Sequence, residues 1–275
     1  MIKDITLGQF FPGNSVIHKL DPRMKLILVV FYIVILFVMK SALSYLLATV
    51  FTLVLMILSK ISFKTYFKGL KPLLIIVIIT GIINLFYGKG DPLVQFWVFK
   101  ITADGILNAS KMILRIALLV ISTAMLTYTT SPVLLTGGLE QLLSPLKVIK
   151  VPVHEFSMMI TIALRFIPTL TEETDKIISA QKARGANFES GNLLKRVKAI
   201  VPIIISLFIS SFRRADELAV AMECRCYTGD GKNRTRLTKY SFRFRDYAAF
   251  LLVCAFLAGV IVLNRFSFTL GAFVL

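Results

Sequence analysis

The sequence predicts an all-α, polytopic membrane protein with about five transmembrane helices and a cytoplasmic helical domain that contains two long amphipathic helices. The chain has 275 residues, of which 56% are hydrophobic and only 17% are charged, and its mean hydropathy is +0.78. Soluble domains are about 45–50% apolar and about a quarter charged. A single soluble core of this length has no room for the excess apolar surface, so burial in a bilayer is expected.

Apolar runs separated by Lys-rich flanks define the predicted spans. The first two runs, 26–39 and 43–58, are shorter than the ~20 residues that a straight helix needs to cross a bilayer. We expect a hairpin of two spans, and one long tilted helix is the alternative. Lys60, Lys64, Lys68 and Lys71 mark a return to the cytoplasmic side. Five spans place the two ends of the chain on opposite sides of the membrane, and the loop charges favour the N-terminus inside and the C-terminus outside. The predicted spans are 26–39, 43–58, 73–87, 106–127 and 247–263.

Changes of pattern along the chain predict three segments. Residues 1–130 form a membrane domain, 131–245 a cytoplasmic helical domain, and 246–275 the final span. In the cytoplasmic segment, prolines at 132 and 152 suit the first turn of a helix, and Gly185 suits a helix end. Arg213 and Arg214 stand beside Asp216 and Glu217, which indicates a charge network within one helix.

The positive charge has a membrane explanation. Lys and Arg number 32 against 15 Asp and Glu, which gives a net charge of +17. In a soluble protein this balance would suggest nucleic acid, but short cytoplasmic flanks of membrane proteins retain Lys and Arg. We therefore expect no nucleic-acid partner.

Two predicted cytoplasmic helices end in the same way. One reads Ala180-Gln181-Lys182-Ala183-Arg184-Gly185 and the other Ala221-Met222-Glu223-Cys224-Arg225-Cys226. Each places a small residue and then an arginine at a helix C-terminus. A cation there complements the helix dipole by about 0.3–1 kcal/mol, so capping explains one such arginine. Repetition at matching positions favours a second explanation, in which each planar guanidinium binds acceptors on a partner.

Several motifs together resemble the transmembrane (T) component of energy-coupling-factor transporters, more the shared-module type than the dedicated metal-uptake type. Any one of them is weak, whereas their order and spacing are specific, and the resemblance covers almost the whole chain. The motifs lie at 8–10, 15–25, 152–155, 164–170, 180–185, 214–219 and Arg225.

The resemblance implies a scaffold in the cell membrane of a prokaryote that binds two ABC-type ATPases through Arg-tipped coupling helices. ATP and Mg would be bound by those ATPases, and the chain itself needs no cofactor. The implied docking residues are Ala183, Arg184, Gly185, Cys224, Arg225 and Cys226. This family usually has Ala-Arg-Gly at the second tip as well. Arg225 is kept and cysteine is small, so docking is expected to persist, although the turn loses glycine's freedom to take positive φ.

The apolar faces of the two coupling helices are the second implied interface. They present more apolar surface than a cytoplasmic segment leaves in water, and in this family such faces hold a small substrate-binding membrane subunit. One or several such subunits, for vitamins or other micronutrients, are therefore expected partners, together with the lipid bilayer. The residues are Phe156, Met159, Ile160, Phe166, Ile203, Ile204, Leu207 and Phe208.

Other functions have less support in the sequence. Cys224 and Cys226 fall short of a four-ligand zinc site, so no metal site is expected. The Gly-x-x-x-x-Gly-Lys-Ser/Thr loop and the common hydrolase motifs are absent, so we expect neither ATP hydrolysis nor other catalysis. A self-sufficient permease for a small solute or metal cation is the alternative; it requires polar residues at mid-membrane, for which Asn84 and Arg115 are the candidates. A membrane enzyme requires several Asp or His at the membrane edge, and Asp21 before Pro22 is better explained as a helix cap.

Overall fold

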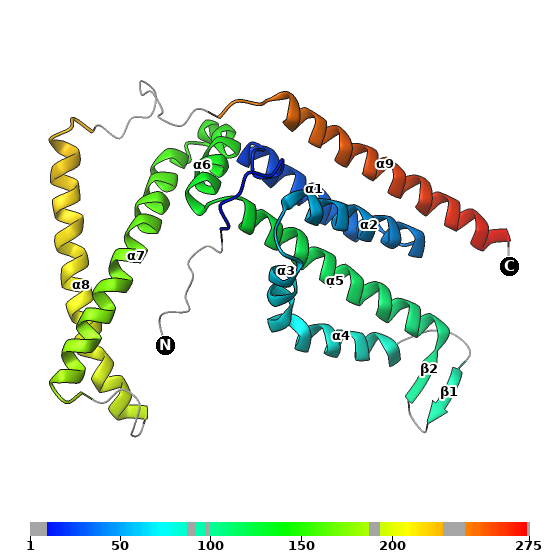
Figure 1. Cartoon of the computed structure of the whole chain (residues 1–275), viewed down its shortest axis with the longest axis horizontal. Coiled ribbons are helices and arrows are strands. Elements are labelled where there is room, and N and C mark those ends of the chain that lie inside the picture. Colours follow the sequence, from blue (N-terminus) through cyan, green and yellow to red (C-terminus); the bar gives the residue numbers. More distant parts are fainter. Residues whose placement is uncertain (1–9, 87–91, 97–98, 187–192, 228–239, 274–275) are drawn as a thin grey trace. The chain divides into compact units, whose positions relative to one another are not determined.

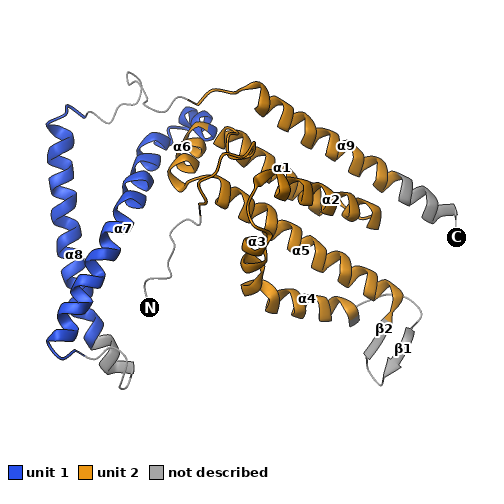
Figure 2. Cartoon of the chain, in the orientation of Figure 1, with its two compact units in different colours: residues 1–7, 142–239 blue, residues 8–141, 240–275 orange. Residues whose placement is uncertain are grey.

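The computed structural model is built from helices and one short hairpin (Figure 1). It describes residues 10–86, 92–96, 99–186, 193–227 and 240–273. By contact the chain divides into two compact units, residues 8–141 with 240–275 and residues 142–239 with 1–7 (Figure 2). The three predicted segments, 1–130, 131–245 and 246–275, were divided by the side of the membrane on which they lie. Contacts within the chain do not test that division, so it stays a prediction.

The larger unit contains the apolar helices. They are α1 (Pro22–Val38), α2 (Ala42–Ser59), α3 (Phe63–Leu70), α4 (Leu74–Phe86), α5 (Ala103–Thr129), α6 (Pro132–Leu142, whose last residue belongs to the other unit) and α9 (Phe244–Phe273). A 3₁₀ turn, η1 (Lys71–Leu73), joins α3 to α4. The antiparallel strands β1 (Pro92–Phe96) and β2 (Phe99–Thr102) precede α5. The predicted all-α polytopic class is confirmed, and the hairpin is an addition that hydropathy did not predict.

Four helical segments of the described chain are long and apolar enough to cross a membrane: 42–59, 63–85, 103–129 and 244–265. The third span was predicted to begin after Pro72, at residue 73, whereas the structure begins it at residue 63. Pro72 does not end the helical segment, because it lies in the first turn of η1, where its missing N–H interrupts no helical hydrogen bond. The remaining predicted span is α1, whose 17 residues extend about 26 Å at 1.5 Å per residue. This length is at the lower limit for spanning, so its crossing remains a prediction.

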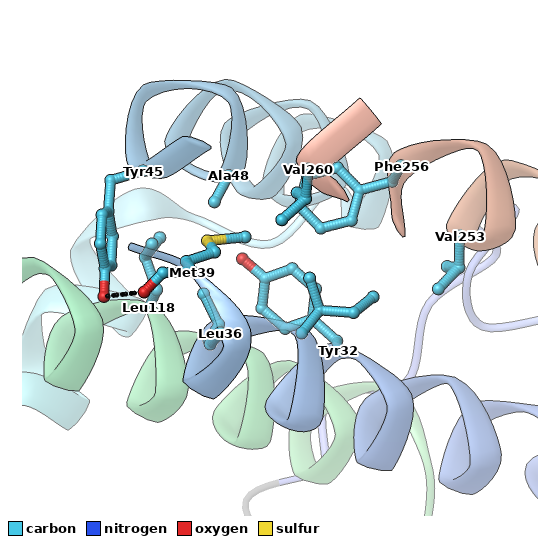
Figure 3. Packing of buried hydrophobic residues seen from close by; sticks show 10 residues of the cluster. Tyr32, Leu36, Met39, Tyr45, Ala48, Leu118, Val253, Phe256 and Val260 are labelled. Atoms are coloured by element: carbon cyan, nitrogen blue, oxygen red, sulfur yellow. Dashed lines mark hydrogen bonds between the residues drawn. The ribbon is translucent and has the colours of Figure 1, made fainter. Parts of the chain in front are cut away.

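A core of stacked aromatic and aliphatic side chains holds α1, α2, α5 and α9 together. The rings of Phe51 and Phe256 stack with centroids 4.4 Å apart, and Tyr32 stacks on both. Figure 3 shows Tyr32, Leu36, Met39 and Ala48 facing Phe256 and Val260. Offset aromatic pairs add about 0.5–1.5 kcal/mol to the area that they bury, so this cluster fixes the position of the last helix against the first two.

Polar contacts hold α9 to α1 at both ends. At one end the Asp246 carboxylate accepts the backbone N–H of Asp21 at 2.9 Å, while Asp21 caps α1 by accepting the N–H of Arg23. This confirms the predicted capping role of Asp21. At the other end Asn264 accepts the N–H groups of Lys40 and Ser41 and donates to the Val38 carbonyl. These bonds satisfy the backbone where α1 ends and α2 begins.

The arginine inside the α5 span is held by protein, as expected of a charge within an apolar helix. The Arg115 guanidinium donates to the Tyr45 hydroxyl at 2.8 Å and to the Met39 carbonyl at 3.2 Å. It also lies over the rings of Phe37 and Tyr45. Arg115 thus joins α5 to the α1–α2 turn, which is a structural role.

The smaller unit consists of η2 (Ser144–Ile149) and two long helices, α7 (Val153–Ala183) and α8 (Leu193–Glu223). The predicted starts hold, since α6 begins at Pro132 and α7 directly after Pro152. Each long helix carries an internal proline, Pro168 or Pro202. Figure 1 shows the two helices crossing and running in opposite directions.

Candidate functional site

The tip of α7 is a helix end closed by its own backbone. Gly185 has φ +85° and donates its N–H to Lys182, and Ala186 donates to Gln181, each at 3.0 Å. This pair of bonds is the Schellman motif, in which a residue of positive φ follows the C-cap. Arg184 is that C-cap. The carbonyls of Ala180, Gln181 and Lys182 are therefore already satisfied by backbone donors, and the Arg184 side chain is not needed to satisfy them.

The tip of α8 has the same hydrogen bonds without a glycine. Cys226 has φ +55° and donates its N–H to Glu223 at 2.8 Å, and Tyr227 donates to Met222 at 3.0 Å. Arg225 thus occupies the position that Arg184 has on α7. The expected loss of glycine's freedom does not change the turn here, because Cys226 adopts the left-handed conformation at some cost in strain.

Both tips face solvent in the isolated chain. The side chains of Ala183, Arg184, Cys224, Arg225 and Cys226 are exposed, and a Cβ added to Gly185 would meet nothing within 4 Å. Because α7 and α8 run in opposite directions, the arginines lie at opposite ends of the helix pair (Figure 1). Two separate partners therefore have room to bind.

An apolar strip is the second feature of this unit. On α8 exposed apolar side chains recur every third or fourth residue, which places them on one helical face. Met159 and Phe156 on α7 are 57% and 56% exposed, and Phe208 is 62% exposed. Of the predicted residues, Ile204 is also exposed, whereas Ile160, Phe166 and Leu207 are partly covered and Ile203 is buried at 6% exposure. The prediction omitted the exposed residues Ile200, Val201, Ile205, Ile209 and Phe212, although their i, i+4 spacing in the sequence indicates one face.

An ion pair joins the two long helices. On α7, Glu173 accepts from Ser210 of α8 at 2.5 Å through one carboxylate oxygen and from Arg214 of α8 at 2.6 Å through the other. The Ser210 hydrogen bond and the charges of Arg214 and Lys176 outweigh burial and lower the pKa of Glu173. The predicted charge network of Arg214 with Asp216 and Glu217 is therefore corrected. Arg214 pairs across the helices, because that contact supplies a carboxylate already ordered by a second hydrogen bond.

Known proteins match over most of the chain. Residues 13–237 match the model of the family CbiQ, described as cobalt transport protein. The chain is 50% identical over 268 residues to the energy-coupling factor transporter transmembrane protein EcfT of Ruminiclostridium cellulolyticum, covering 98% of this chain and 100% of the relative. It is 52% identical over 260 residues to EcfT of Clostridium kluyveri, covering 92% and 96%. The chain belongs to the CbiQ family of transport proteins, together with these EcfT relatives. The resemblance to energy-coupling-factor T components is thereby confirmed.

Membership in the family makes the chain a membrane component of an energy-coupling-factor transporter. Its apolar helices agree with that assignment.

Proposed function

We propose that the chain is the scaffold through which two ABC-type ATPases drive uptake of a vitamin or other micronutrient. The observation that carries the proposal is the pair of matching exposed tips, each with an arginine directly before the residue of positive φ at which backbone hydrogen bonds close the helix end. A mere capping role gives no reason for the same arrangement twice. Two similar ATPases would require two similar docking elements.

The substrate-binding membrane subunit would cover the apolar strip on α7 and α8. Exposed apolar patches of this kind mark contact with protein or membrane, and methionine repacks against different surfaces. Met159 therefore suits a scaffold shared by several substrate subunits. Ile203 would support the strip from beneath, since it is already buried within the chain.

The cell membrane of a prokaryote is the expected location, in keeping with the sources of the relatives. ATP and Mg would be bound by the ATPases. A self-sufficient permease would need polar groups free to bind its solute in the membrane. In the described part of the chain, Asn84 and Arg115, the two candidates for that role, bond to the protein itself, which favours the scaffold over the permease.

Arginine substitutions separate docking from capping. If the arginines only complement helix dipoles, Arg184→Ala and Arg225→Ala should each cost about 0.3–1 kcal/mol and leave ATPase co-purification intact. If each guanidinium is buried in an ATPase, its loss leaves partner acceptors unpaired, at about 2–5 kcal/mol. Lysine lacks the planar fork and should rescue only in part.

The control is Arg213→Ala, which removes an exposed arginine of α8 away from the tip. We expect it to retain both ATPases, whereas the double variant Arg184→Ala, Arg225→Ala should lose them while keeping its substrate subunit. Near-normal uptake by the double variant would end the docking proposal.

A further inference from the structure

An apolar cavity lies within the larger unit, between α1, α2, α5 and α9. Its volume is about 310 Å³, at the lower end of the range for ligand pockets. Most of its wall is aliphatic or aromatic, including Leu28, Val29, Tyr32 and Phe51. Val16, Leu58 and Leu252 also line it and are exposed, so the cavity is open at its side.

The hydroxyl groups in the wall are already used. Thr52 donates to the Ala48 carbonyl and bonds the Tyr32 hydroxyl at 2.6 Å. Ser122 donates to Leu119 and Thr129 to Met125, at 2.9 and 2.8 Å. A polar solute would find no unpaired hydroxyl to replace its water, and burying such a solute unpaired is costly. The cavity therefore suits a hydrocarbon chain.

Two cations line the cavity, and they differ. Lys25 is buried and its ammonium donates to the carbonyls of His18 and Thr129 and to the Thr130 hydroxyl, at 3.3, 3.0 and 3.0 Å. These three bonds use all its donors. Arg245 is exposed, and its side chain makes no hydrogen bond or ion pair with any other residue that the structure describes. Its guanidinium is available to an anion at this end of the cavity.

Arg245 and the hydrocarbon wall belong to one face of α9. Arg245, Ala248, Ala249 and Leu252 all line the cavity, and their spacing of three, four and seven residues places them on the same side of the helix. Between Arg245 and Leu252 this face carries the small side chains of Ala248 and Ala249, which take up little of the cavity. A molecule with an anionic head and an apolar tail matches this arrangement.

We propose that this cavity binds one acyl chain of an anionic phospholipid, with the lipid phosphate on Arg245. The N-termini of α1 and α9 and the C-termini of α2 and α5 meet at this end, which the Lys-rich flanks place at the cytoplasmic face. The cytoplasmic leaflet is where anionic lipids attract basic side chains. The bound lipid would fill the gap between the last span and the first two.

Native mass spectrometry of the full chain tests the proposal, with phosphatidylglycerol and phosphatidylcholine of identical acyl chains as probes. Wild type should retain one phosphatidylglycerol in preference to phosphatidylcholine. Arg245→Ala should lower phosphatidylglycerol retention about fivefold, the equivalent of about 1 kcal/mol for one basic residue at the membrane surface, and leave phosphatidylcholine unchanged. Ala249→Phe, which places a large side chain in the cavity, should lower retention of both.

The matched control is Arg243→Ala. Arg243 is also exposed at this end, but its contact with Asp246 is made by its backbone N–H, and it does not line the cavity. It should retain phosphatidylglycerol as wild type does. Equal retention of the two lipids by wild type, or an equal loss in Arg243→Ala and Arg245→Ala, would overturn the proposal. So would loss of the lipid when the ATPases and substrate subunit assemble, since a partner would then be the occupant.

Discussion

Removing the Glu173 carboxylate should loosen the crossing of α7 and α8. In the structure Glu173 accepts a charged hydrogen bond from Arg214 and a neutral one from Ser210. The side chains of Arg214 and Glu173 are 35% and 23% exposed, so solvent screens the pair and about 1 kcal/mol is the upper limit for its coupling. The Ser210 bond adds about 1 kcal/mol. Glu173→Ala should therefore cost about 2 kcal/mol, and Arg214→Ala about half of that.

Amide hydrogen exchange on the full chain in detergent measures this loss locally. If α7 and α8 open against each other before they exchange, about 2 kcal/mol corresponds to about thirtyfold faster exchange of the amides near the crossing, and about 1 kcal/mol to about fivefold. The matched control is Glu172→Ala, because Glu172 is the exposed neighbour on the same helix. In this variant the amides near the crossing should exchange at the wild-type rate.

The effect should depend on pH in a definite direction. The pKa of Glu173 is lowered in the folded chain from its ordinary value of 4.5, so its stabilising contribution is complete above that value and is lost as the pH falls through the folded pKa. Glu173→Gln should exchange faster than wild type near neutrality, and the two should converge in acid. Equal acceleration by Glu172→Ala, or zero coupling in a Glu173–Arg214 double-mutant cycle, would refute the reasoning.

Three further outcomes are expected. Cys226→Gly should change the thermal midpoint of unfolding little, because relief of about 1 kcal/mol of left-handed strain is offset by about 0.5–1 kcal/mol of glycine entropy. Cys226→Val should lower the midpoint, and a valine variant more stable than wild type would contradict the left-handed conformation at residue 226. The purified chain should not turn over ATP, since its sequence has no phosphate-binding loop, and turnover that persists through further purification would contradict the scaffold. Phe208→Lys places a charge on the apolar strip and should release the substrate subunit in co-purification while the ATPases remain; retention of every substrate subunit would contradict that interface.

Sequence patterns predicted the elements whose causes are local. Apolar runs located four of the five predicted spans, the third of them with a later start than the structure has, prolines located the starts of α6 and α7, and Gly185 located the end of α7. The matching arginines were found in the same way, since each tip is a motif of six consecutive residues, 180–185 and 221–226. Such features need no knowledge of which helices become neighbours.

Features that depend on tertiary contact were missed or misassigned. Arg214 has acidic residues two and three positions ahead on its own helix, yet it pairs with Glu173, 41 residues away in sequence. Ile203 and Ile204 are adjacent and equally apolar, yet the first is buried and the second exposed, because only the packing of the unit decides which face is covered. The cavity at Arg245 needs four helices from distant parts of the chain, so no local pattern predicts it.

Photo-cross-linking from the two tips of the assembled transporter tests the central claim most directly. A photoreactive amino acid at position 183 or 224 leaves Arg184 and Arg225 in place, and one at position 213 serves as the control on an exposed site away from the tips. The scaffold account predicts that 183 and 224 each cross-link to an ATPase, that the two products contain different ATPase copies, and that 213 yields neither. Cross-links from either tip to the substrate subunit alone, or none to an ATPase from either, would contradict it.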